Sequence, residues 1–168
     1  DLVILATGIL HQGALVRPEK SLKDIDPICF ADVFLANTIG PSLVMKYFLP
    51  HMNKERKSVF AVLSARVGSI SDNQLGGWYS YRSSKAALNM MVKTASIEMA
   101  RSNQNLCVVG LHPGTVDTDL SRPFQKNVSE EQLFSPEQSS RHLLDVIDGL
   151  SSEQTGQLFA WDGKEIQP

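Results

Sequence analysis

The sequence predicts an α/β fold in which four parallel strands alternate with helices that cover both faces of the sheet. Short unbroken apolar runs recur along the chain, and such runs are typical of strands that are buried on both sides. Long segments rich in helix formers separate them. Parallel strands need crossover connections of this kind, so the alternation favours a doubly wound sheet with right-handed crossovers.

The first half of the chain supplies two strands and one long helix. We expect a strand, a polar loop, a helix and a second strand at residues 2–6, 9–26, 27–52 and 58–64. Asp26 is placed to cap the helix and Pro27 suits its first turn. Gly40-Pro41 interrupts the helical pattern and should bend or locally open it.

The second half continues the alternation. We expect a loop, a helix, a strand, a polar segment, a helix and a last strand at residues 65–77, 78–102, 106–111, 115–135, 136–149 and 157–161. Ser135 is the predicted cap of the last helix, with Pro136 in its first turn. The polar segment is too long for a simple connection, which makes it a candidate substrate lid.

Composition describes one ordinary globular domain over residues 1–168, with 42% hydrophobic and 20% charged residues. A net charge of −2 without basic runs gives no reason to expect nucleic acid or an anionic membrane as a partner. Two cysteines in apolar contexts indicate reduced thiols, and four scattered histidines give no reason to expect a metal site. No apolar run approaches the roughly 20 residues of a membrane span, and no signal peptide is visible, so we expect a cytoplasmic protein.

Tyr81 and Lys85 are the most informative residues. Four positions apart on a helix, they share one face. Tyrosine loses its proton near pH ~10, and a nearby ammonium favours the phenolate, so we expect Lys85 to lower the pKa of Tyr81 and to suit it for acid–base chemistry. The alternative for the pair alone is an exposed helical turn with an extended lysine.

The predicted topology brings other residues to the same place. Ligands of open parallel sheets bind beyond the carboxyl ends of the strands. Those ends carry Thr7-Gly8, Ser64-Ala65 and residues 112–115. The helix with Tyr81 and Lys85 starts at the same edge.

The chain resembles the carboxyl-terminal two-thirds of a short-chain dehydrogenase/reductase, and within that superfamily the C-factor and sniffer-like carbonyl reductases. The matching segments are Asp1-Leu-Val-Ile4, Asn37-Thr-Ile-Gly-Pro41, Val62-Leu-Ser-Ala-Arg-Val-Gly68, Tyr81-x-x-x-Lys85, His112-Pro-Gly-Thr-Val-Asp-Thr118 and Phe159-Ala-Trp-Asp-Gly163. They occur in the family's order and span essentially all 168 residues. The resemblance implies a partial Rossmann-like sheet that lacks the amino-terminal βαβαβ portion, and it agrees with a sequence that starts inside a strand without methionine.

The resemblance also implies roles. Tyr81 would be the general acid/base, Lys85 would hold the nicotinamide ribose, and Asn37 would hold a water in the proton relay. A locally bonded helix-interior asparagine is the alternative for Asn37, and a plain strand-ending turn is the alternative for the segment after the third strand. The implied cofactor-binding residues, besides Tyr81 and Lys85, are Thr7, Gly8, Pro113, Gly114, Val116 and Thr118.

Two features depart from the family pattern. The usual Ser-Ser pair at the end of the second strand reads Ser64-Ala65, so strict alignment puts alanine at the catalytic position. We expect Ser64 to supply the substitute hydroxyl; the alternatives are Ser69 in that role, or that Ser64 is a plain strand-end serine. The glycine-rich loop that seats the pyrophosphate does not occur in the sequence, which leaves the adenosine half of a cofactor almost without a site.

The implied function is NAD(P)(H)-dependent carbonyl reduction or alcohol oxidation, with NADP, or NAD, as cofactor and a small carbonyl compound or alcohol as substrate. Leu120, Phe124 and Leu133 in the lid suggest a partly apolar substrate. The two long helices would pair subunits into a homo-oligomer. The alternative is a non-catalytic remnant or a C-factor-like signalling protein that no longer binds dinucleotide.

Overall fold

Four strands form one parallel sheet in the computed structural model, which describes residues 1–13 and 15–168. The strands stand in the order β1-β2-β3-β6, and they are β1 (Leu2–Leu5), β2 (Ser58–Leu63), β3 (Leu106–His112) and β6 (Leu158–Ala160). All three pairings are parallel. The predicted α/β fold is therefore confirmed, and no strand end differs from its predicted position by more than one residue.

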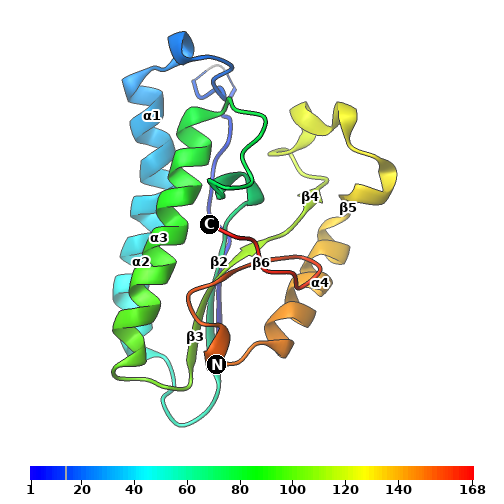
Figure 1. Ribbon diagram of the computed structural model, residues 1–168. Coiled ribbons are helices and arrows are strands. Elements are labelled where there is room, and N and C mark those ends of the chain that lie inside the picture. Colours follow the sequence, from blue (N-terminus) through cyan, green and yellow to red (C-terminus); the bar gives the residue numbers. More distant parts are fainter. Residues whose placement is uncertain (14) are drawn as a thin grey trace.

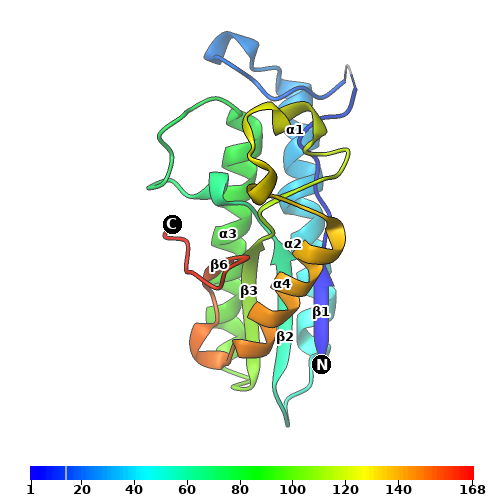
Figure 2. The same ribbon diagram turned by 90° about the vertical axis from the view of Figure 1, so that its right-hand side faces the viewer.

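Helices cover the two faces of the sheet as separate layers (Figures 1 and 2). One layer contains α1 (Pro27–Phe34), α2 (Gly40–Phe48) and α3 (Tyr79–Ala100), and α4 (Pro136–Gly149) lies on the opposite face. Because successive side chains of a strand point to opposite faces, Phe60 packs with Leu88 of α3, whereas Val59 packs with Leu143 of α4. Each face thus has its own hydrophobic core.

The first long helix opens between α1 and α2, where Leu35–Ile39 form a π-helical turn. The N–H of Gly40 donates to the carbonyl of Leu35, five residues earlier. Pro41 has no N–H, so the carbonyl of Asn37 has no donor in the α-helical pattern. The predicted opening is therefore present, but it occupies the turn that precedes Gly40-Pro41.

The same helical segment, Pro27–His51, is long and apolar enough to cross a membrane, with a mean hydropathy of 1.6 in its best window, of which 28% is buried. The expectation that no segment of this kind exists is therefore wrong by length and composition. One such helix is weak evidence for a membrane span, because the core helix of a globular protein can be equally long and apolar. Met45 and Leu49 of this segment do pack into the core beside the sheet.

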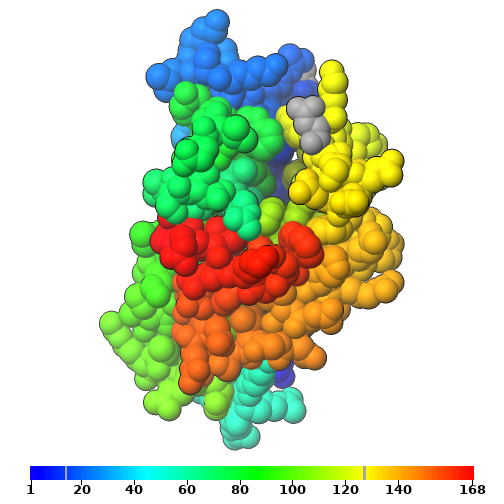
Figure 3. Space-filling model, turned by 45° about the vertical axis from the view of Figure 1, so that its right-hand side comes forward, coloured from blue at the N-terminus to red at the C-terminus, as the bar shows by residue number. Residues whose placement is uncertain are grey.

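The lid, residues 115–135, contains a second small sheet. Its strands β4 (Thr115–Val116) and β5 (Leu133–Phe134) pair in parallel, with 3-10 turns at Arg122–Asn127 and Glu130–Gln132 between them. In the space-filling view the lid, in yellow, lies on the same face as the carboxyl-terminal segment, in red (Figure 3). The sequence predicted the lid as a polar segment and did not predict the small sheet.

Ser135 caps α4, as the sequence predicted, and together with Gln138 it forms a capping box, which was not predicted. The hydroxyl of Ser135 accepts the N–H of Gln138 at 3.2 Å, and the Gln138 side-chain oxygen accepts the N–H of Ser135 at 2.8 Å. Replacing Ser135 with alanine should lower the free energy of unfolding by about 1 kcal/mol, measured by urea denaturation. Ser135→Asp, which keeps a hydrogen-bond acceptor at the cap, should lower the free energy of unfolding much less. An equal loss in both variants would show that the cap is not the cause.

Candidate active site

Tyr81 and Lys85 lie in the first two turns of α3, at the carboxyl edge of the sheet. Both are buried, with 8% and 3% of their surface exposed. The ammonium of Lys85 donates to the carbonyl of Leu63, the last residue of β2, at 2.9 Å. It lies 5.8 Å from the centre of the Tyr81 ring. The pair is therefore not the exposed helical turn that a chance occurrence would give.

Burial governs the protonation of both groups. It raises the pKa of Tyr81 to about 12, because the phenolate loses its hydration. It lowers the pKa of Lys85 to about 8 for the same reason. The expectation that the ammonium lowers the tyrosine pKa is therefore wrong for this structure. At neutral pH the tyrosine is a protonated phenol.

Asn37 connects the π-helical turn to two distant segments and is completely buried. Its side-chain oxygen accepts the N–H of Ile9 at 2.7 Å, and its amide donates to the carbonyl of Ile9 at 2.9 Å. The amide also lies 3.1 Å from the hydroxyl of Ser84 on α3. These long-range contacts contradict the alternative of a locally bonded asparagine.

Gly8 lies between these residues, in the loop that leaves β1. A Cβ atom on Gly8 would lie 3.3 Å from the side-chain oxygen of Asn37 and 3.3 Å from the ammonium of Lys85. Thr7 is exposed beside it. The structure thus brings together Tyr81, Lys85, Asn37 and Gly8 from three separate segments.

The two candidate serines lie elsewhere. Ser64 is hydrogen-bonded to the side chain of Asn89 at 2.6 Å, and the hydroxyl of Ser69 donates to the carbonyl of Gln167. Ala65, by contrast, packs in one cluster with Tyr81. These contacts correct the expectation that Ser64 supplies the substitute hydroxyl. They also speak against the alternative, because the hydroxyl of Ser69 is bonded to the carboxyl-terminal segment and not to Tyr81. The residue beside the tyrosine is the alanine that strict alignment indicated.

The predicted residues after β3 form a separate, tightly packed turn. Gly114 has a φ of +77°, and a Cβ atom there would lie 2.6 Å from the Phe134 ring and 3.0 Å from Trp161. The carbonyl of Pro113 accepts the hydroxyl of Ser139 at 2.9 Å. These contacts fasten the turn to α4 and to the carboxyl-terminal segment. Val116 and Thr118 follow in the first part of the lid.

Sequence reasoning named Ala65 and Phe124 but did not place them in contact with Tyr81, and it missed Leu10 and Trp78. Tyr81 forms a cluster with Leu10 and Ala65, against which the partly buried Trp78 and Phe124 pack. The three glycines of the loop before α3 indicated a turn there, and the backbone of Trp78 does adopt a left-handed conformation. Nothing in the local pattern marked the other members, because they are distant in the sequence.

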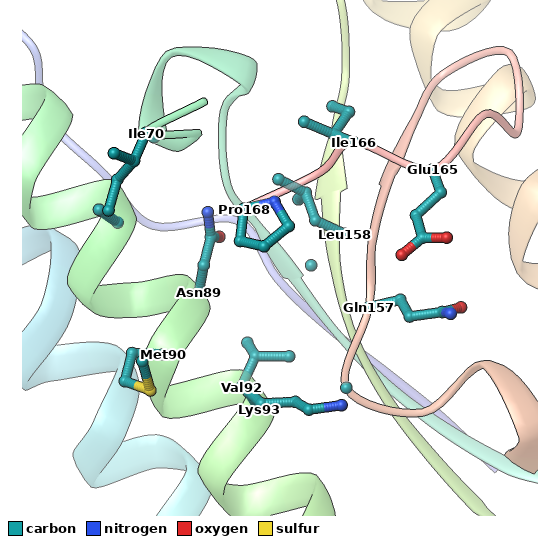
Figure 4. A pocket seen from close by; sticks show the side chains of 14 residues that line it. Ile70, Asn89, Met90, Val92, Lys93, Gln157, Leu158, Glu165, Ile166 and Pro168 are labelled. Atoms are coloured by element: carbon teal, nitrogen blue, oxygen red, sulfur yellow. The ribbon is translucent and has the colours of Figure 1, made fainter. Parts of the chain in front are cut away.

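A cavity of about 370 Å³ lies beside α3 (Figure 4), and Tyr81 is not among the residues that line it. Its wall includes Asn89, Leu158, Ile166 and Pro168, so it lies between α3 and the carboxyl-terminal segment. Ser64 bonds to Asn89 and therefore belongs to this side of the helix. The cavity is a different place from the cluster around the buried phenol.

Comparison with known proteins identifies the family of the chain. The sequence model described as short chain dehydrogenase matches residues 2–129. The C-signal of Myxococcus xanthus is 37% identical over 146 residues, which are 87% of this chain and 82% of that protein. The 1-hydroxy-2-glutathionyl-2-methyl-3-butene dehydrogenase of Rhodococcus sp. (strain AD45) is 37% identical over 131 residues, which are 78% of this chain but 55% of that protein.

Solved structures give the same fold. The carbonyl reductase Sniffer of D. melanogaster has a TM-score of 0.83 at 24% identity, over 99% of this chain and 66% of that one. An NADPH-bound carbonyl reductase from chicken fatty liver has a TM-score of 0.81 at 26% identity, over 98% of this chain and 62% of that one. The chain thus spans just under two-thirds of these structures. With the family match over residues 2–129, these findings show that the chain belongs to the short-chain dehydrogenase family, as its motifs predicted.

Proposed function

We propose that the protein is a cytoplasmic NAD(P)(H)-dependent oxidoreductase that reduces a small carbonyl compound or oxidises the corresponding alcohol. The observation that carries this proposal is the buried pair of Tyr81 and Lys85 at the carboxyl edge of a parallel sheet. Gly8 and Asn37 adjoin the pair. Relatives named as a dehydrogenase and as NADPH-bound carbonyl reductase support it.

Tyr81 would act as the proton donor. Burial raises its pKa to about 12, so the phenol is protonated at neutral pH and can donate to a carbonyl oxygen that gains negative charge. Alcohol oxidation needs the phenolate, which the buried environment disfavours. At neutral pH the phenol is thus in the form that donates a proton in carbonyl reduction.

The residues around Lys85 fit the nicotinamide half of a dinucleotide, NADP or NAD. Gly8 has no side chain, and a Cβ atom there would already crowd the ammonium of Lys85, so only glycine leaves this ammonium uncovered on that side. The ammonium offers three donors, which suit the ribose hydroxyls. The remaining contacts would come from Thr7, Pro113, Gly114, Val116 and Thr118. When bound, the dinucleotide supplies the hydride.

Asn37 would hold a water molecule of the relay that returns a proton to Tyr81. Its carbonyl has no α-helical donor, because Pro41 lacks an N–H, and a carbonyl of this kind can hold a water molecule. Its side chain fixes the loop that contains Gly8. Because Ala65 has no hydroxyl, polarisation of the substrate carbonyl would fall mainly to Tyr81.

Titration with NADPH tests the proposal directly. We expect a saturable change in nicotinamide fluorescence with the wild type. Lys85→Met should bind NADPH at least about tenfold more weakly than the wild type, because charged hydrogen bonds to the ribose are lost. The exposed Lys93→Met on the same helix is the matched control and should bind like the wild type. Unchanged nicotinamide emission in a folded wild-type protein would remove dinucleotide binding from the proposal.

A second candidate function is that of a non-catalytic signalling or interaction protein. The relative named C-signal supports it. The helical layer supports it as well, because Ile28, Tyr47 and Met90 are 72%, 63% and 64% exposed. We propose that these helices pair subunits into a homo-oligomer, a feature compatible with either function. Light scattering distinguishes a dimer from a monomer, and the NADPH titration separates the two functions.

A further inference from the structure

Aromatic side chains from two segments gather next to the buried phenol. The ring of Trp78, just before α3, lies 6.2 Å from the ring of Tyr81 and 4.9 Å from the ring of Phe124, in edge-on arrangements. Phe124 comes from the lid and packs against the cluster of Leu10, Ala65 and Tyr81. A ring of the lid therefore helps to enclose the group that must meet the substrate.

Trp78 is a fixed wall of this enclosure. Its φ of +53° is rare for a bulky residue and persists only where the surroundings impose it. The buried Glu19 imposes it, because its carbonyl accepts the N–H of Trp78 at 2.6 Å and its carboxylate accepts the N–H of Ser80 at 3.2 Å. The tryptophan thus has a set position at the start of α3.

Phe124 is held differently. The hydrogen bonds around it remain largely inside the lid, where Gln125 donates to Asp117 at 3.0 Å and to the hydroxyl of Ser121 at 2.8 Å. The His11 ring, 5.7 Å from the Phe124 ring, bonds to the carbonyl of Asp119 and connects the lid to the loop after β1. The ring can therefore leave the cluster with the lid, without breaking the sheet or α3.

We propose that the Phe124 ring occupies the place of the substrate's own planar apolar group, and that the site takes aromatic or conjugated carbonyl compounds whose ring displaces Phe124 and packs on Trp78. The proposal rests on the proposed function, because it assumes that Tyr81 meets the carbonyl. The described hydrophobic cluster consists of Leu10, Ala65, Val67, Trp78, Tyr81 and Phe124, so apolar and aromatic surface adjoins the phenol, with the Lys85 ammonium 5.8 Å from the Tyr81 ring. Such a lining suits a flat apolar group.

Tryptophan fluorescence can test this in the chain itself. The chain has two tryptophans, so Trp161→Phe leaves Trp78 as the reporter. We expect acetophenone to quench it saturably, beyond the collisional quenching of N-acetyltryptophanamide, and to bind several-fold more tightly than cyclohexyl methyl ketone. Phe124→Ala should tighten acetophenone binding about tenfold, because the ligand no longer competes with the ring (roughly 1.4 kcal/mol). Glu131→Ala, an exposed residue of the lid outside the cluster, should leave it unchanged.

Equal or weaker acetophenone binding in a Phe124→Ala protein whose circular dichroism is unchanged would overturn the proposal. Equal affinity for the two ketones would overturn the preference for a planar group. Turnover separates this proposal from the proposed function. If acetophenone binds as expected but is not reduced with NADPH, the proposed reaction fails and the binding site stands. If reduction occurs while Phe124→Ala leaves the affinity unchanged, the reaction stands and the role of Phe124 fails.

Discussion

Replacing Tyr81 with phenylalanine should lower NADPH-dependent reduction of an aromatic aldehyde such as benzaldehyde by roughly 10²–10⁴-fold. The variant loses one oxygen atom and with it the proton that the carbonyl oxygen must receive. Ala65 beside it cannot compensate, because it has no hydroxyl. Steady-state kinetics should show the loss in kcat.

Tyr79→Phe is the matched control, because it removes a phenol two residues earlier in the same helix, about 200° away around the helix axis. It should keep wild-type turnover. Both variants should unfold at wild-type or higher urea concentrations, so a low rate in Tyr81→Phe cannot come from unfolding. Retention of more than a tenth of the wild-type kcat by Tyr81→Phe would exclude this tyrosine as the proton donor.

Replacing Lys85 with methionine should stabilise the protein at pH 7. Burial lowers the pKa of Lys85 to about 8, below its usual value of about 10.4 in the unfolded chain. Between these values the unfolded state binds more protons than the folded state, so wild-type stability rises with pH. Relative to Lys85→Met, the free energy of unfolding of the wild type should rise by about 2 kcal/mol from pH 7 to pH 9.5.

Urea denaturation of both proteins at the two pH values measures this difference. Tyr81 and Cys107, whose pKa values burial raises, are present in both proteins, so their contributions largely cancel. The exposed Lys93→Met should keep the wild-type pH profile. A difference between wild type and Lys85→Met that does not change with pH would mean that the ammonium carries no burial cost. A stabilising variant that binds NADPH poorly would show that this lysine is kept for function.

Local signals predicted the fold well. The strands are continuous apolar runs, and Asp26 and Ser135 cap their helices as expected, because a cap depends on residues three positions away. The opening of the first helix was predicted at Gly40-Pro41 but lies one turn earlier. The reason is that a proline has no N–H to donate to the carbonyl four residues before it, which here is the carbonyl of Asn37.

The site was predicted in part. Spacing and topology placed Tyr81 and Lys85 at the sheet edge, but their pKa values depend on burial, which neighbours distant in the sequence provide. The choice between Ser64 and Ala65 depends on where the chain turns after β2, and the sequence does not specify that turn. Glu19 lies 61 residues before Ser80, whose N–H it accepts, so no local pattern could have found it.

The π-helical turn sets the phase of the helix that follows it. Each residue of an α-helix advances it by about 100°. Deleting one residue between positions 35 and 39 would let the α-helical ladder continue and rotate α2 by about that angle. Met45 would then swing away from the sheet, and the surface residues Leu43 and Tyr47 would change sides. The spacing between Asn37 and Met45 is thus a rotational constraint that joins the carboxyl edge of the sheet to the core.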